Sequence, residues 1–171
     1  MSSTARRAVG VALVLVLATI ALLMRSCVGL NEEQRAQIQA WLECDDCLSG
    51  ELDSVVGMGS RAIPALAAYL SDGPSRERLQ ALQRYLETVH RQLSLLSTDS
   101  GGSPYLPTRR EFISEYLARY REMYQVRAAI AVGEIGGKKA KGTLGALLAK
   151  PGLPVEVLVR VRHIHDSVLQ Q

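Results

Sequence analysis

Residues 126–136 read VRAAIAVGEIG, and this stretch decides the fold that we expect for the chain. A run of small and apolar residues is typical of a buried helix, and glycine is the residue that most often ends one. The pattern occurs twice, because residues 55–59 (VVGMG) resemble residues 132–136 (VGEIG). Downstream, residues 65–70 (ALAAYL) match residues 143–148 (TLGALL). The chain therefore contains a repeated unit of helix, glycine turn and helix.

These repeated stretches must stack on each other, because one such helix pair cannot bury its own apolar stripe. They resemble the HEAT-like α-helical repeats, including those of the PBS-lyase type. Residues 126–136 resemble the end of a first repeat helix, with Val132 at the position where the family pattern has leucine. Residues 62–66 (AIPAL) resemble the start of a second repeat helix. The resemblance covers about residues 50–73 and 126–165. It implies an all-α fold, a short α-solenoid of stacked helical hairpins, that binds other proteins and has no catalytic residue.

A long helical hairpin is predicted as an insertion between the two matches, over residues 75–125. Its first helix carries apolar residues at steps of 3, 4, 3, 4 and 3, which form a seam along one side: Leu79, Leu82, Leu86, Val89, Leu93 and Leu96. Residues 97–107 (STDSGGSPYLP) have the composition of a loop. Thr108 and Glu111 then have the spacing of a capping box, which predicts the start of the second helix.

The first thirty residues form a separate segment, which we interpret as a membrane anchor or signal. Residues 8–24 (AVGVALVLVLATIALLM) carry no charge and would form a helix of about 25 Å, near the lower limit for crossing a bilayer. Arg6 and Arg7 precede this stretch and Arg25 alone follows it, which favours a cytoplasmic amino terminus. The sequence thus predicts a transmembrane helix that holds the body, residues 31–171, outside the cytoplasm, in the bacterial periplasm or cell envelope.

Two alternatives for this leader stay open. A secretory signal has the same layout with a shorter apolar stretch, and Cys27 and Gly29 are weak candidates for its small residues. Cys27 could instead be lipidated, although Arg25 and Ser26 precede it where small or apolar residues are expected. All three interpretations place the body outside the cytoplasm.

The charge of the body argues against nucleic acid as a partner. The chain has 20 lysine and arginine residues, and three of these lie in the first thirty residues, which contain no acid. The remaining 17 bases are balanced by 17 acids. A neutral body has no electrostatic attraction for phosphate backbones.

Cys44 and Cys47 are the most specific polar signal in the body. Two thiols three residues apart can form a disulfide, act as a redox pair or hold half of a metal site. We expect a structural disulfide, because disulfides persist outside the cytoplasm. The negative charges of Asp45 and Asp46 between the two cysteines disfavour a reactive thiolate. The sequence also lacks a second C-x-x-C motif that would complete a zinc site. A thiol–disulfide or metal-handling role for this pair is the alternative function.

An aromatic stripe in the second helix of the hairpin is the candidate binding surface. Phe112, Tyr116, Tyr120 and Tyr124 follow one another at steps of four residues, with arginines such as Arg119 between them. Tyrosine and arginine are enriched at binding hot spots, so we predict that Tyr116, Tyr120, Tyr124 and Arg119 contact a partner. The alternative is that the stripe packs on the leucine seam of the first helix as an antiparallel hairpin.

These observations favour a scaffold over an enzyme. The sequence contains neither a G-x-S-x-G nucleophile motif nor a phosphate-binding G-x-x-x-x-G-K-[ST] motif. We expect a membrane-tethered, extracytoplasmic helical-repeat scaffold that binds an unknown protein partner, with no catalysis, no cofactor and no metal.

Overall fold

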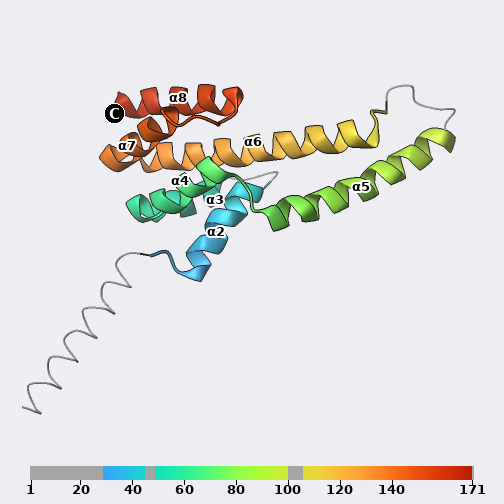
Figure 1. Ribbon diagram of the computed structural model, residues 1–171. Coiled ribbons are helices and arrows are strands. Elements are labelled where there is room, and N and C mark those ends of the chain that lie inside the picture. The colour runs from blue at the N-terminus through green and yellow to red at the C-terminus, as the bar shows by residue number, and fades with distance from the viewer. Residues whose placement is uncertain (1–28, 45–48, 100–105, 171) are drawn as a thin grey trace, which may run out of the picture.

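The computed structural model describes residues 29–44, 49–99 and 106–170, and within these ranges all of the regular secondary structure is helical (Figure 1). The predicted all-α fold is confirmed. The helices are α2 (Glu32–Glu43), α3 (Ser49–Gly57), α4 (Ile63–Asp72), α5 (Arg76–Asp99), α6 (Arg109–Ile135), α7 (Gly137–Leu148) and α8 (Val155–Leu169), with a short 3-10 helix (Gly59–Arg61) between α3 and α4.

Across the helices of these ranges, none combines the length and the apolar character that a bilayer span requires. The predicted anchor at residues 8–24 lies outside the described residues and stays a prediction.

Local sequence sets the ends of several helices. The predicted capping box before α6 forms, with the Glu111 amide donating to Thr108 Oγ1 at 3.3 Å and the Thr108 amide donating to the Glu111 carboxylate at 3.0 Å. A second capping box joins Asn31 and Gln34 at the start of α2. Gly136 ends α6 with a φ of 65°, which is a left-handed conformation that glycine adopts without strain. Such caps depend only on neighbouring residues, so they can be identified from sequence.

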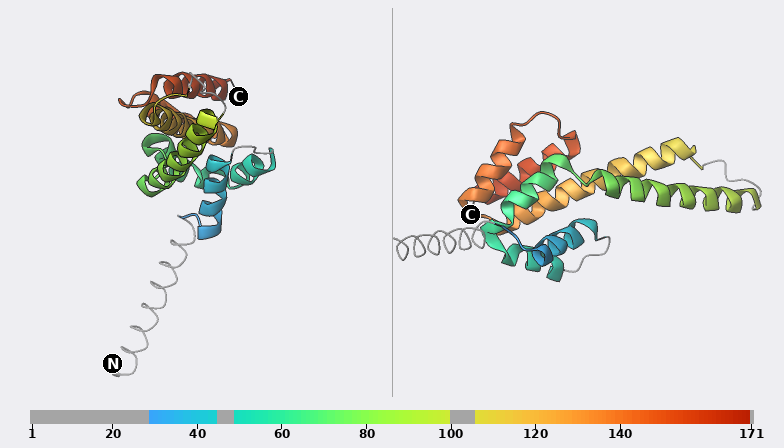
Figure 2. Two further views of the ribbon diagram at one scale, coloured as in Figure 1. Left: turned by 90° about the vertical axis from the view of Figure 1, so that its right-hand side faces the viewer. Right: turned by 60° about the horizontal axis from the view of Figure 1, so that its bottom comes forward.

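Helix α6 lies at the centre of the molecule and contacts each of the six other described α-helices. In Figure 1, α2, α3 and α4 lie below it, and α7 and α8 lie on its other side. Helix α5 runs antiparallel to the first half of α6, and the two extend from the body as an arm (Figure 2). We define the arm as α5 with residues 109–123. The predicted end of the insertion, residue 125, falls inside α6, which continues without a break from the arm into the body.

The two predicted repeat units stack through both of their helices. Helix α3 contacts α6, and α4 contacts both α6 and α7, so each helix of the first unit lies against the second unit. Their shared core is built from leucine, valine, isoleucine and alanine side chains, including Leu66, Leu70, Val132 and Leu144. Stacking thereby buries the apolar stripes that a single unit would leave exposed.

Small residues let the neighbouring helices approach α6 closely. Ala128, Ala129, Ala131 and Gly133 are all buried in its second half. A Cβ atom added at Gly133 would overlap the Cγ2 methyl of Ile164 in α8. Isoleucine is β-branched and has one strongly preferred χ1 rotamer in a helix, so this methyl cannot easily rotate away. Gly133 is therefore required by the packing of α8 and not by the backbone conformation.

Two polar side chains of α6 cap the ends of other helices. Gln125 is buried, and its Nε2 donates to the carbonyl of Leu70 at 2.9 Å, in the last turn of α4. Arg127 donates from Nη1 to the carbonyl of Leu42 at 3.3 Å, in the last turn of α2, and Trp41 returns a bond to the Arg127 carbonyl. Carbonyls in a last turn have no partner within their own helix. The central helix therefore supplies the donors that α2 and α4 lack.

We expect Gly133→Ala to destabilise the protein by about 1–3 kcal/mol, because the added methyl overpacks the α6–α8 contact. The matched control is Gly142→Ala, at an exposed helical position of α7 where a Cβ meets no atom within 4 Å. There the better helix propensity of alanine should stabilise by about 0.5–1 kcal/mol. Urea unfolding followed by circular dichroism measures both. Equal effects of the two changes would contradict the close α6–α8 packing.

Gln125→Leu should destabilise by about 1–3 kcal/mol, because it leaves the buried carbonyl of Leu70 without a donor while keeping the side-chain volume. Gln83→Leu is the control, since the Gln83 amide bonds only across one turn of exposed helix to Glu87. We expect the control to change the free energy of unfolding by less than about 0.5 kcal/mol. If both variants unfold at the same denaturant concentration, the hydrogen bond from Gln125 to the end of α4 does not contribute to the stability of the protein.

Candidate protein-binding groove

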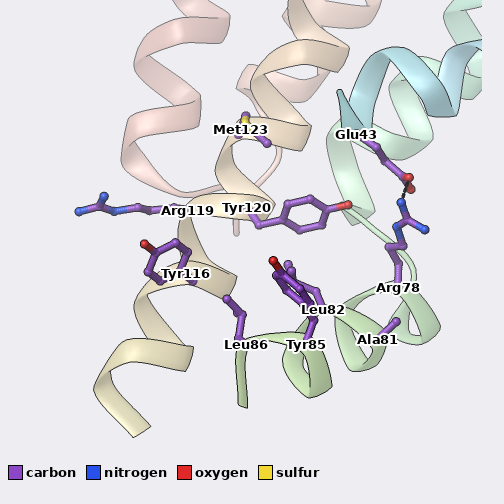
Figure 3. Close-up of a pocket in the computed structure, with 10 residues that line it drawn as sticks. All are labelled: Glu43, Arg78, Ala81, Leu82, Tyr85, Leu86, Tyr116, Arg119, Tyr120 and Met123. Carbon is purple, nitrogen blue, oxygen red and sulfur yellow. Dashed lines mark hydrogen bonds and ion pairs between the residues drawn. The ribbon is translucent and has the colours of Figure 1, made fainter. Parts of the chain in front are cut away.

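A groove of about 640 Å³ lies where the arm meets the body, between α5, α6 and the end of α2 (Figure 3). Its floor is mostly apolar, and polar groups lie at its two ends. The lining residues are Glu43, Arg78, Ala81, Leu82, Tyr85, Leu86, Tyr116, Arg119, Tyr120 and Met123. The groove therefore combines the predicted leucine seam with part of the predicted aromatic stripe.

The two walls of the groove are held together by a small apolar cluster of their own. Leu86, Phe112 and Ile113 are buried between α5 and α6, with further side chains packed against them: Leu82, Val89 and Leu117. Helices α5 and α6 thus pack as an antiparallel pair, and the middle of the predicted seam packs on α6, whereas Leu93 and Leu96 at its end are exposed. A hairpin of only two helices covers one side of this seam, which leaves the other side open as the groove.

The aromatic stripe does not lie on one face. Phe112 and Tyr124 are buried, whereas Tyr116 is 51% exposed and Tyr120 is half-buried. Four residues of α-helix advance by about 400°, so each step turns the stripe by about 40° around the helix axis. Over the three steps from Phe112 to Tyr124 the stripe turns by about 120°. Phe112 therefore packs against α5, and Tyr124 packs against α4.

Tyr124 is a core residue and not part of an exposed binding surface. It is 2% exposed and packs edge-on against Tyr69 of α4, with ring centroids 5.8 Å apart. Burial raises the pKa of its hydroxyl above the ordinary value. The prediction that Tyr124 contacts a partner is therefore corrected. Tyr116, Tyr120 and Arg119 all line the groove, and their role in binding stays a prediction.

A polar corner joins three helices at one end of the groove. Glu43 at the end of α2 forms an ion pair with Arg78 at the start of α5 (Figure 3). Arg78 also donates a hydrogen bond to the hydroxyl of Tyr120 in α6. This bond and the charge of Glu43 raise the pKa of Arg78 above its ordinary value, so the guanidinium stays charged. The corner fixes the orientation of the Tyr120 ring along the groove wall.

Arg119 lies at the other end of the groove on an exposed part of α6. Its Nη2 lies 2.6 Å from a carboxylate oxygen of Glu115, one turn earlier on the same helix. An exposed ion pair of this kind contributes only about 0.3–0.5 kcal/mol to stability. The guanidinium can therefore change partners at low cost, which suits a rim residue that meets a carboxylate on another molecule.

Tyr85 is the groove residue that the sequence reasoning missed. It is 65% exposed and lines the groove from α5, as Tyr116 does from α6 (Figure 3). The signal was present, since Tyr85 lies three residues after Leu82 and four before Val89, beside the apolar seam. An aromatic residue at that spacing lies on the edge of the seam and not in its centre, where it stays partly exposed.

Cys44 directly follows α2 and is disulfide-bonded. The sulfur to which it is joined lies outside the described residues, so its predicted pairing with Cys47 stays a prediction. The bond lies next to Glu43 in sequence and so constrains the chain beside the polar corner. Among the described residues, no group of three or more histidine, cysteine, aspartate and glutamate side chains is placed to hold a metal ion.

No protein-family model matches the chain, and comparison with curated proteins and with solved structures finds no match either. The likeness to HEAT-like repeats therefore stays an inference from the residues.

Proposed function

We propose that this protein is a membrane-tethered, extracytoplasmic helical-repeat scaffold whose groove binds a helical segment of a protein partner. The stacking of the α3–α4 pair on α6 and α7 supports the HEAT-like repeat interpretation. The charge pattern around residues 8–24 supports the tether. The groove, which lies where the arm meets the body, supports the binding role.

One observation carries the proposal: each of two packed helices contributes an exposed tyrosine to one mostly apolar groove. Tyr85 and Tyr116 stand on two helices that are packed together, so little backbone freedom is lost when a ligand binds. Tyrosine supplies a large apolar area and a polar hydroxyl, and it is among the residues most enriched at binding hot spots.

The shape of the groove favours a helix as its ligand. Its walls are two antiparallel helices whose shared seam is covered on one side only, and a third helix laid along the open side would cover the rest. Recognition of this type uses apolar residues at i, i+3, i+4 and i+7 of the ligand helix. An acidic residue at the edge of that helix would meet Arg119 at the rim.

The chemistry of the groove favours binding over catalysis. Glu43 is the single carboxylate among its lining residues, and Arg78 holds it in an ion pair. A carboxylate that already pairs with a guanidinium of the same protein is less available to a bound ligand.

We expect a photo-crosslinking residue placed at position 116 of the full chain, in cells that produce it, to form a discrete protein adduct. The matched control is position 118 on the same helix, because Ala118 is exposed and points about 160° away from Tyr116. Adducts at position 116 and not at position 118 identify the groove as the binding surface. Equal adducts at both positions, or none at position 116, would contradict the proposal.

Once the adduct is identified, the double change Tyr85→Ala and Tyr116→Ala should weaken binding of the purified partner at least tenfold. The reason is that two hot-spot tyrosines are each expected to contribute more than about 1 kcal/mol. Both side chains are more than half exposed, so the melting temperature should stay within about 2 °C of the parent value. Affinity is measured by isothermal titration calorimetry, and unchanged affinity with an unchanged fold would remove both residues from the interface.

A further inference from the structure

A second groove, of about 730 Å³, lies between α6 and α8. Five residues of α6 line it: Arg119, Glu122, Met123, Val126 and Ile130. Arg119 and Met123 also line the groove where the arm meets the body. The two grooves therefore meet on α6 and share part of its surface. We call them the first groove, beside α5, and the second groove, beside α8.

The residues of α6 in the two grooves include one line of evenly spaced side chains. Tyr116, Arg119, Met123, Val126 and Ile130 follow one another at steps of 3, 4, 3 and 4 residues. This spacing averages 3.5 residues, which is the period at which one α-helix contacts a second helix along its whole length. Tyr116 and Arg119 are exposed, and the other three side chains are half-buried. We call these five residues the open face of α6.

The open face occupies a sector of α6 that its packed neighbours among the described helices leave partly uncovered. At 100° per residue, its five members point within about 80° of each other. Tyr124, which packs on α4, points about 120° away from the middle of this sector. Gly133, which lies under Ile164 of α8, points about 60° away on the other side. A further helix packed along the open face would displace neither neighbour.

Each half of the open face has a wall beside it. Leu82 and Tyr85 of α5 line the first groove together with Tyr116. His163 and Ile164 of α8 line the second groove. A helix laid along the open face would thus contact α5 over its first half and α8 over its second half. It would bury apolar side chains in both places, and such burial is the dominant favourable contribution to most protein association.

The charges that line the two grooves balance. Two of the three arginines in them, Arg78 and Arg119, are paired with glutamates. The third, Arg160 of α8, is matched in number by Glu122 of α6. A ligand helix therefore needs no particular net charge here, and the period of its apolar residues decides whether it fits.

We propose that one continuous helix of the partner protein occupies both grooves and lies along the open face of α6, with an apolar heptad repeat of at least two heptads. Tyr116 and Ile130 lie 14 residues apart, which is about 21 Å of helix. The inference rests on the proposed function, because it extends the helix bound in the first groove. It gives that helix a minimum length and makes α8 part of the binding surface.

Photo-crosslinking at position 160 of the full chain tests this inference, in the same cells as the crosslinking at position 116. Arg160 is exposed and lines the second groove. The matched control is Arg162, which is exposed on α8 and points about 160° away from Arg160. We expect position 160 to capture the protein that position 116 captures. Mass spectrometry of the crosslinked peptides should place the two attachment sites about 7–14 residues apart in its sequence.

Three results at position 160 would overturn the continuous helix. A second copy of this chain, or a protein different from the one captured at position 116, would show that the second groove has its own occupant. Attachment sites in distant segments of the partner would show two separate contacts. Equal adducts at positions 160 and 162 would show that the second groove is not the contact surface.

Purified components test the required length of the helix. Removing from the partner segment the heptad that attaches to position 160 should weaken binding at least tenfold, and this change leaves the present protein untouched. Val126 lines the second groove only, so Val126→Ser should weaken binding of the full segment at least fivefold and of the shortened segment less than twofold. The shortened segment thereby reports whether the variant is folded. Isothermal titration calorimetry measures all four affinities, and equal effects of Val126→Ser on both segments would contradict the inference.

The inference and the proposed function can fail separately. Adducts at position 116 without adducts at position 160 overturn the continuous helix and leave the first groove as the binding surface. Adducts at position 160 alone overturn the continuous helix and the first groove together. Adducts at neither position also overturn both.

Discussion

The close approach of six helices to one central helix is the constraint on which the rest of this structure depends. Helix axes come within 8–10 Å of each other only where the intervening side chains are small enough. The second half of α6 meets this condition with Ala128, Ala129, Ala131 and Gly133, and Gly133 lies directly under Ile164 of α8. Larger residues there would separate α8 from α6 and open the core that the two helices share.

The same helix connects this core to the arm. Because α6 is unbroken from residue 109 to residue 135, the orientation of the arm is set by the packing of its other half between α4 and α8. The ion pair of Glu43 with Arg78 joins α2 to the base of α5, and the bond from Arg78 to Tyr120 joins that base to α6. A groove held in this way can present Tyr85 and Tyr116 in one fixed arrangement, which is what a scaffold for a helical ligand needs.

Local features of the fold were predictable because their causes are local. Both capping boxes, the glycine that ends α6 and the antiparallel pairing of α5 with α6 follow from residues that are close in sequence or from an apolar period. The groove was predictable in part. Tyr116, Tyr120 and Arg119 line it, and the spacing of the aromatic stripe implies that its ends point in different directions. The spacing does not say that α4 covers Tyr124 or that Tyr85 completes the opposite wall.

The sequence by itself determined that the body is helical and where several of its helices begin or end, because hydrogen bonding at helix ends and apolar periodicity act over a few residues. Only the tertiary structure decided that Gln125 and Arg127 cap helices 55 and 85 positions away and that one tyrosine of the stripe is exposed while another is buried. Burial depends on which distant segments cover a side chain, and no local pattern in a single chain carries that information.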